Sequence, residues 1–324
     1  MLRRIARILA AALAAAATAA AAQGYPAKTL TLIVPFAAGG PTDTLGRILA
    51  ERMSKSLGQT IVVENVAGAG GTIAINRVKQ SAADGYTVAI GHIGTHVLAP
   101  FVQGLTVDYV NDFEPVAMVA TNPQVMLSKN DVPAKTLKEL VAHVKANPGK
   151  VSYGTGGPGT PSHVMAVYFG NQIGAPLNIV HYKGAGPAMQ DLLAGHIDLS
   201  FDQAATAVGF VKGGRARGYA ITAKSRIAAA PDIPSVDEAG LPGFYMSIWH
   251  AIWVPKGTPR EVIAKLNGVI REALADPALR KRWEDMGQEV PAVEQLSPEA
   301  LRAHHKAETE KWGPLIRDAG IRAQ

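Results

Sequence analysis

Hydrophobic residues along the chain follow two alternating patterns. Short runs rich in Val, Ile and aromatic residues, typical of buried β-strands, are separated by segments whose apolar residues recur at helical spacing. In one such segment Leu45, Ile48, Leu49 and Met53 fall on one helix face, and Gly58 ends it. The predicted strands cover residues 30–36, 59–66, 86–92, 150–154, 178–183, 197–202, 218–223 and 247–255. Strands that alternate with helices predict an α/β fold of mostly parallel sheets covered by helices on both faces.

The alternation breaks at two places. Residues 115–129 form one long extended stretch without the helix that a simple crossover needs. A second break comes around residues 218–226, where a loop-rich segment follows. Each break is typical of a chain that leaves one sheet and enters another. We therefore expect two lobes with a ligand cleft between them. The division we predict is residues 23–122 plus 224–324 for lobe 1 and residues 123–223 for lobe 2.

The first 22 residues have the pattern of a signal peptide. Arg3, Arg4 and Arg7 precede an uncharged apolar stretch from Ile8 to Ala22 that ends in small residues. An alanine-dominated run this short is weak for spanning a bilayer. We expect export to the periplasm with cleavage near Ala22. The export route, general or twin-arginine, stays open.

Composition excludes several classes of function. The chain of 324 residues contains no cysteine, which excludes structural disulfides, thiolate zinc sites and a cysteine nucleophile. Its net charge of +6 falls to +3 when the three arginines of the leader are removed. No basic stripe with interleaved aromatic residues remains, so we expect no binding to nucleic acid.

A glycine-rich loop follows the predicted strand at 150–154. Gly154, Gly156 and Gly159 have the G-x-G-x-x-G spacing, and a helix is predicted to begin near Ser162. Free backbone N–H groups and the positive end of a helix dipole then meet at one point, which favours an anion. A dinucleotide site would also need an acidic residue about twenty positions later, at the end of the next strand. That strand ends without one, so the loop predicts a site for another anion and no nucleotide cofactor.

Two further loops have a similar setting. Residues 35–43 follow the first predicted strand and lead into a helix, and Gly91 and Thr95 follow the third strand. All three loops lie at C-terminal ends of strands, where open α/β sheets bind ligands. Because the first and the middle loop belong to different predicted lobes, we expect an anion to be held from both sides of a cleft. For any one loop alone, an ordinary strand-to-helix turn is the alternative.

No catalytic or metal-binding set is evident. Ser162 and His163 are neighbours in sequence, so a Ser-His-Asp arrangement would need another histidine, and no G-x-S-x-G elbow occurs. His92 and His96 stand four residues apart, but without H-E-x-x-H or a nearby carboxylate pair they make a poor metal site. We expect no metal, no cofactor and no catalysis. A secreted α/β enzyme of the hydrolase type that uses the same cleft is the alternative.

Several stretches, taken in order, resemble one family. They include PFAAGGPTD, VVENVAGAGG, ADGYTVAIG, DFEPVAMVA, VSYGTGGPGTPSH and HYKGAGPAMQDLLAGHIDLSFD. Together they are similar to the substrate-binding receptors of tripartite tricarboxylate transporters, also called Bug proteins, from Tyr25 to Ile321. The resemblance implies a type II periplasmic-binding-protein fold whose two α/β lobes close on one small ligand. It also implies delivery of that ligand to a two-component membrane permease.

The resemblance implies a set of binding residues as well. In the family a ligand carboxylate is held by backbone amides, hydroxyls and bridging waters from the first and middle glycine loops. With the third loop included, the predicted set is Phe36, Ala38, Gly39, Thr42, Asp43, Gly91, Thr95, Thr155, Gly156, Gly159, Ser162 and Asp202. Asp43 is expected to brace its loop, because like charges repel. Asp202 either faces the distal part of the ligand or caps the helix ahead of Ala204.

The distal part of the pocket departs from the family pattern. Family members commonly have an Asn-Pro pair after the third strand, where this sequence has HVLAPF at 96–101. We expect Leu98, Ala99 and Phe101 to make that wall apolar, which favours an apolar or aromatic carboxylate over citrate or a small amino acid. A monomer is expected. The identity of the ligand stays open.

Overall fold

The structure, a computed structural model, describes residues 24–323. Its strands are β1 (Leu30–Val34), β2 (Ile61–Asn65), β3 (Thr87–His92), β4 (Phe113–Ser128), β5 (Ser152–Thr155), β6 (Asn178–His181), β7 (Leu199–Gln203), β8 (Arg217–Ile221) and β9 (Ser247–Pro255). Its longer helices are α2 (Pro41–Leu57), α3 (Thr72–Lys79), α6 (Leu137–Ala146), α7 (Pro161–Ile173), α8 (Ala185–Leu193), α9 (Ala204–Lys212), α10 (Arg260–Ala275), α11 (Pro277–Asp285) and α12 (Pro298–Asp318). Shorter helical segments are η1 (Ala69–Gly71), the π-helix η2 (Gly94–Leu98), α4 (Ala99–Val102), α5 (Tyr109–Asp112) and η3 (Val293–Leu296). A strand lies at every predicted place, whereas the predicted signal peptide, residues 1–22, lies outside the described residues.

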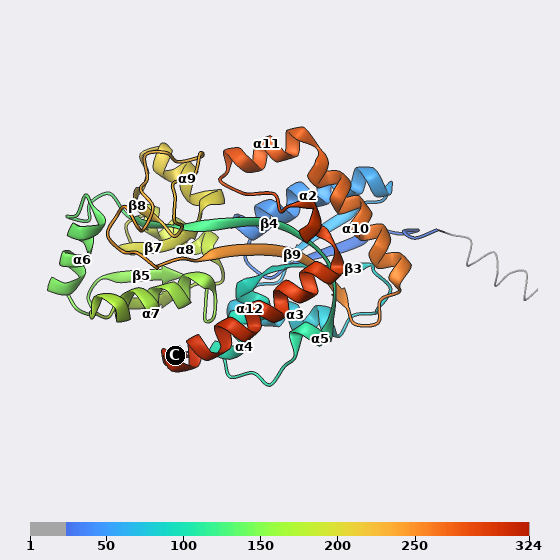
Figure 1. Ribbon diagram of the computed structural model, residues 1–324, viewed down its shortest axis with the longest axis horizontal. Coiled ribbons are helices and arrows are strands. Elements are labelled where there is room, and N and C mark those ends of the chain that lie inside the picture. Colours follow the sequence, from blue (N-terminus) through green and yellow to red (C-terminus); the bar gives the residue numbers. More distant parts are fainter. Residues whose placement is uncertain (1–23, 324) are drawn as a thin grey trace, which may run out of the picture.

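The strands form two sheets that share β4 (Figure 1). The first sheet has the order β2-β1-β3-β9-β4, and the second has the order β6-β5-β7-β4-β8. Pairs away from β4 and β9 are parallel, and helices α2, α3, α7 and α8 supply the crossover connections that parallel neighbours need. The predicted two-lobed α/β architecture is confirmed. Each sheet is parallel in its outer part and antiparallel where the shared strand enters it.

Strand β4 crosses from one lobe to the other. Up to Pro123 it pairs antiparallel with β9, and from Gln124 onward it pairs with β7 and β8. Its register with β9 shifts near Ala117 and near Ala120, and such bulges bend and twist a strand. Pro123 stands where the pairing changes partner, as expected for a residue that cannot donate to a ladder. The prediction that the extended stretch at 115–129 crosses between sheets is confirmed.

The second crossing lies later in the chain than we expected. Strand β8 still pairs with β4 in the second sheet, and the segment after it stays there, because the Val236 N–H donates to Ile221 O and the Met246 N–H donates to Thr222 O. The chain returns along β9, beside β4 (Figure 1). The loop pattern at 218–226 marks the end of β8, whereas the return depends on the pairing of β9. The division of the chain into lobes at residue 223 stays a prediction.

Helices cover both faces of each sheet. In the first lobe α2, α10 and α11 bury Leu45, Ile270 and Trp283 against one face, and α3 and α12 cover the other. In the second lobe α8 and α9 lie on one face, and α6 and α7 lie on the other. Each lobe is thus a helix–sheet–helix sandwich, so the crevice at the strand ends between the lobes is where polar backbone groups are left to bind a ligand. None of the helices within residues 24–323 combines the length and apolarity that crossing a membrane requires.

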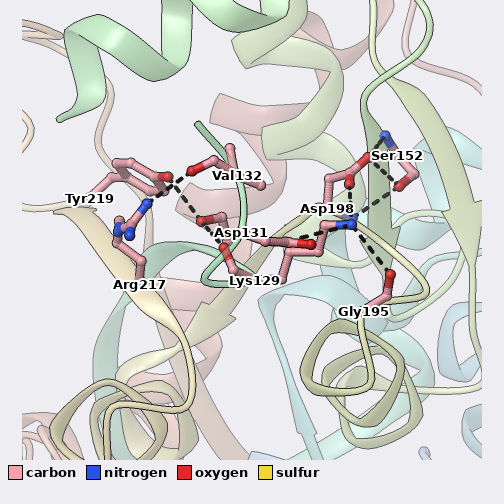
Figure 2. Close-up of polar contacts among 9 residues, drawn as sticks. Lys129, Asp131, Val132, Ser152, Gly195, Asp198, Arg217 and Tyr219 are labelled. Atoms are coloured by element: carbon pink, nitrogen blue, oxygen red, sulfur yellow. Dashed lines mark hydrogen bonds and ion pairs between the residues drawn. The ribbon is translucent and has the colours of Figure 1, made fainter. Parts of the chain in front are cut away.

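A polar cluster joins the starts of β5 and β7 in the second sheet (Figure 2). Asp198 accepts hydrogen bonds from the amide and the hydroxyl of Ser152 at 2.8 and 2.7 Å, and the ammonium of Lys129 lies 3.0 Å from its other oxygen. Lys129 also reaches the exposed carboxylate of Asp131 at 3.7 Å. Burial alone would raise the pKa of Asp198, but the hydrogen bonds from Ser152 and the charge of Lys129 outweigh burial and lower this pKa. In its charged form the Asp198 carboxylate therefore holds the start of β5 next to the start of β7.

We predict that Asp198→Asn lowers the free energy of unfolding by about 1.5–3 kcal/mol, because hydrogen bonds to a charged group contribute that much. The matched control is Asp131→Asn, whose side chain is 76% exposed and whose ion pair with the same lysine should contribute little. Urea unfolding followed by circular dichroism measures both. Equal stability of the two variants would show that the Asp198 cluster does not hold the sheet.

Candidate ligand-binding site

A small cavity of about 30 Å³ lies between the two lobes. From the first lobe it is lined by Phe36, Gly40, Pro41, Thr42, His92 and Ile248. From the second lobe and the crossing strand it is lined by Gln124, Gly156, Thr160, Pro161, Ser162, Ala185, Phe201, Asp202 and Gln203. A second cavity of about 90 Å³ adjoins the first and shares Gly40, Pro41, Ala185 and Asp202 with it. The structure thus shows a closed crevice with contributions from both lobes.

Four helices begin at the first cavity. Their N-cap residues are Gly40 for α2, Thr160 for α7, Gly184 for α8 and Gln203 for α9, and each of these or its successor lines the cavity. The first N–H groups of a helix have no partner within the helix, and the helix dipole places partial positive charge there. The cavity is therefore surrounded by unpaired amide donors and positive dipole ends. A negatively charged group fits such a place.

The beginnings of α2 and α7 share one construction. Each has proline at its first position, Pro41 or Pro161, and each makes its first intrahelical bond from the fourth, Thr44 N–H to Gly40 O and Val164 N–H to Thr160 O. Proline has no N–H, so the donors that precede the ladder in each helix belong to the second and third residues. Thr42 and Ser162 are those second residues, and both line the cavity.

Some residues of the first glycine loop line the cavity, and others support the loop. Phe36 and Thr42 line the cavity, whereas Ala38 and Gly39 are exposed, and Gly39 lines only the adjoining cavity. Asp43 is buried and accepts hydrogen bonds from the Gly39 amide at 3.0 Å, from Arg47 and from Asn65. Burial alone would raise the pKa of Asp43, but these hydrogen bonds outweigh it and hold the pKa below its usual value. As expected, Asp43 braces its loop.

The middle glycine loop is held by its own side chains. The hydroxyl of Thr155 lies 2.6 Å from His181 Nδ1 and accepts from the Gly157 amide, so it points into the loop. The Gly156 amide donates to Ser162 Oγ at 3.0 Å. Of the four residues predicted from this loop, Gly156 and Ser162 line the cavity, and Thr155 and Gly159 do not. The loop therefore presents the amides at the start of α7 and the Ser162 hydroxyl to the cavity. The amides of its glycines contribute less to an anion site than the glycine spacing indicated.

Two glycines permit the lobes to touch. A Cβ at Gly159 would clash with the backbone of Ala99 in the opposite lobe, and a Cβ at Gly70 would clash with the carbonyl oxygen of Pro158. Both glycines have positive φ, +80° and +62°, which other residues rarely adopt. The glycine at 159 is thus explained by close approach of the two lobes and by backbone conformation. Neither reason requires a bound pyrophosphate.

The sequence and the fold are both similar to those of known receptors. Residues 45–321 match the profile of the tripartite tricarboxylate transporter family receptor. The chain belongs to this receptor family. Among solved structures, the periplasmic binding protein BugD is 38% identical with a TM-score of 0.89, covering 93% of this chain and 100% of BugD. MatC from Rhodopseudomonas palustris with bound malate is 36% identical with a TM-score of 0.87 over 90% of this chain and 100% of MatC. A further R. palustris protein, with adipate, is 30% identical with a TM-score of 0.87 over 92% of this chain and 99% of its own.

The family assignment and the two-lobed periplasmic-binding-protein fold are therefore confirmed. The chain is a solute receptor by family, and its cavity lies where the family resemblance placed the ligand, between the first and middle glycine loops. The ligand contacts of the individual residues stay predictions. Gly91 and Thr95 do not line the cavity; Thr95 is fully buried and its hydroxyl bonds the backbone of His92 and the ring of His96.

Asp202 stands at the boundary between cavity and helix. It is buried and lines both cavities, and its Oδ2 accepts a hydrogen bond from Thr206 in the first turn of α9. The N-cap of α9 is Gln203, so Asp202 is not the cap. Its Oδ1 has no partner within residues 24–323, and burial raises the pKa of Asp202 to about 6. The receptor thus keeps an acceptor, charged only above that pH, in the wall of its cavity.

The distal wall differs from our expectation. Leu98, Ala99 and Phe101 do not line the cavity, and its apolar surface comes from Phe36, Phe201 and Ile248 instead. Sequence analysis missed Gln124, Phe201 and Ile248, because their place depends on which face of β4, β7 and β9 meets the crevice. His92 was noticed only as a weak metal ligand. Its position as the last residue of the third strand was the signal that could have found it.

The receptor's cavity has one pairing that resembles catalytic chemistry. Thr42 Oγ1 lies 3.2 Å from His250 Nε2. An activated hydroxyl needs a histidine whose other nitrogen is oriented by a third group, but His250 Nδ1 has no partner within the described chain. Burial holds the pKa of His250 well below its usual value. In residues 24–323 no group of three His, Asp or Glu side chains is placed to hold a metal ion.

We predict that the stability difference between Asp202→Asn and the wild type depends on pH. Because the pKa of Asp202 rises from 3.8 to about 6 on folding, its contribution to stability is fully present below pH 3.8 and is lost as the pH rises through 6. The free energy of unfolding of the variant, minus that of the wild type, should therefore grow by up to about 3 kcal/mol between pH 4 and pH 8. Urea unfolding without ligand at several pH values measures it. A constant difference would show that Asp202 titrates normally.

Proposed function

We propose that this receptor captures a small aliphatic dicarboxylate, or a compact hydroxy acid of similar size, between its lobes. The observation that carries the proposal is the meeting of four helix N-termini, one from the first lobe and three from the second, at one cavity. Bound malate and bound adipate in the two related structures support a dicarboxylate. Residues Thr42 and Ser162, the second residues of α2 and α7, are the proposed anchors of one carboxylate. Gly40 of the first lobe and Ala185 of the second lobe bring backbone groups to this cavity.

The cavity must widen before any carboxylate can enter. Its volume of about 30 Å³ has room for only one or two water molecules, so the ligand enters when the lobes part. Phe36, Phe201 and Ile248 offer enough apolar surface for a short carbon chain, and the adjoining cavity extends the space past Gly40. Because two related structures hold malate and adipate, we favour aliphatic over aromatic carboxylates, which reverses the preference drawn from the sequence.

Closure of the lobes is the proposed means of capture. The Ala37 N–H donates to Lys183 O at 3.0 Å, and Gln103 Nε2 donates to Pro158 O at 3.1 Å, each bond joining the first lobe to the second. A ligand that bridges the lobes adds its own bonds to this closed form and shifts the population toward it. β4 and β9, which connect the lobes, are the strands about which the lobes would move (Figure 1).

Binding strength does not require a buried arginine. Micromolar affinity corresponds to about −8 kcal/mol, and a hydrogen bond to a charged group contributes about 1.5–3 kcal/mol. Several amide donors at the helix starts, with apolar burial against Phe36 and Phe201, would reach this value after the entropy cost of association. We infer that the receptor, exported to the periplasm, delivers the captured ligand to the membrane permease of a tripartite tricarboxylate transporter.

The ligand proposal is tested by a binding screen. Isothermal titration calorimetry with succinate, malate, glutarate, adipate and benzoate should give dissociation constants near or below micromolar for one or more of the aliphatic dicarboxylates, and much weaker binding of benzoate. Binding of benzoate alone would contradict the proposal. Mass spectrometry of the ligand after incubation separates a receptor from an enzyme, because turnover would support the alternative of a hydrolase-like enzyme.

We predict that Gly156→Asp lowers the affinity for the best ligand of this screen at least a hundredfold. A Cβ at Gly156 lies 3.3 Å from the Ala185 amide, so the new carboxylate would occupy the anion site and repel the ligand. Gly209→Asp is the control, because a Cβ on this exposed position of α9 meets nothing within 4 Å. Thermal melting without ligand checks that both variants fold. Wild-type affinity in a folded Gly156→Asp variant would remove the loop from the site.

A further inference from the structure

We propose that His92 selects the second functional group of the ligand, by donating a hydrogen bond from its Nε2–H to an oxygen acceptor such as a second carboxylate. His92 is the last residue of β3 and lines the cavity. The inference rests on the proposed function, because it concerns the same ligand. It adds a residue that determines specificity to the helix starts that anchor the first carboxylate.

The loop after β3 fixes which nitrogen of His92 carries the proton. The Gly94 N–H donates to His92 Nδ1 at 2.8 Å, so Nδ1 must be the unprotonated nitrogen. Burial lowers the pKa of His92 to about 3, and the ring is neutral at physiological pH. A neutral ring that accepts at Nδ1 carries its hydrogen on Nε2. Nε2 makes no hydrogen bond to any residue in the range 24–323, and His92 lines the cavity, so this donor is available to a ligand.

Aromatic neighbours fix the orientation of the ring. Phe36 stacks on His92 with ring centroids 5.0 Å apart and planes 11° from parallel. His250 meets it edge-on at 5.3 Å and is itself held by the hydroxyl of Thr42. Only 2% of His92 is exposed. The ring cannot turn without disturbing the first glycine loop and β9, so its donor is preorganised, and a preorganised polar group discriminates strongly against ligands that leave it unpaired.

A neutral donor suits this place better than a cation would. Helix starts already supply positive potential around the cavity, and Asp202 supplies an acceptor from β7. An uncharged Nε2–H recognises an oxygen without adding charge. The ligands that it favours are dicarboxylates and acids with a hydroxyl or carbonyl oxygen beyond the anchored carboxylate. Simple monocarboxylates of the same length would leave the donor unpaired.

Two substitutions separate this role from a structural one. His92→Asn keeps an acceptor near the position of Nδ1 for the Gly94 amide but removes the donor toward the cavity. His92→Gln keeps a donor near the position of Nε2 but gives up the bond to the loop. His196→Asn, at an exposed side chain on the second lobe, controls for the exchange of histidine as such. The probes are succinate and butyrate, which have the same chain length and differ in the second carboxylate, and the measurement is isothermal titration calorimetry.

We expect the wild type and His196→Asn to prefer succinate over butyrate. His92→Asn should lose this preference by about ten- to hundredfold, the range expected for one hydrogen bond to a charged group, and His92→Gln should retain most of it. Equal loss of both ligands in His92→Asn, or an unchanged preference in that variant, would overturn the inference and leave the proposed function intact. Failure of the wild type to bind any carboxylate would overturn both.

Discussion

Unpaired backbone amides at helix starts are the constraint on which the rest of this structure depends. Such donors must find a partner, and here four helices direct them to one crevice. The parallel outer strands deliver the chain to that crevice, because their C-terminal ends meet it and a helix begins after each. Proline at the first position of α2 and α7 removes one donor from each and leaves a defined pair. Fold and site are therefore consequences of the same arrangement.

Glycine serves the close approach of the lobes more than it serves the anion. Gly159 meets Ala99, Gly70 meets Pro158, and Gly186 meets the loop at Gly40, each across the crevice. A side chain at these positions would hold the lobes apart, and the amide donors of one lobe would then lie too far from a ligand bound to the other. The spacing that resembles a nucleotide-binding loop thus has another physical reason. It permits contact between two backbones, and the anion is left to the helix ends.

The sequence was sufficient for what local pattern determines, and insufficient for what distant pairing determines. Strands and helix starts were predictable because periodicity, proline and glycine are local signals. The return of the chain along β9 was not, since it depends on antiparallel pairing with β4. For the same reason Gln124 and Ile248 were missed as lining residues, and Leu98, which was expected in the wall, does not line this cavity. Thr155 was expected to face the ligand, but His181 on the neighbouring strand β6 takes its hydroxyl.

Charge balance explains why a receptor for anions can keep an acid in its cavity. Neither lysine nor arginine is among the residues of the described chain that line it. Four helix starts carry roughly half a positive charge each, about +2 together, which matches one dicarboxylate. Ionised Asp202 would exceed that balance, and burial already disfavours its charge. A protonated Asp202 would keep the balance, and a protonated carboxyl can donate as well as accept. The same residue could then pair with a hydroxyl or with a carboxylate of the ligand.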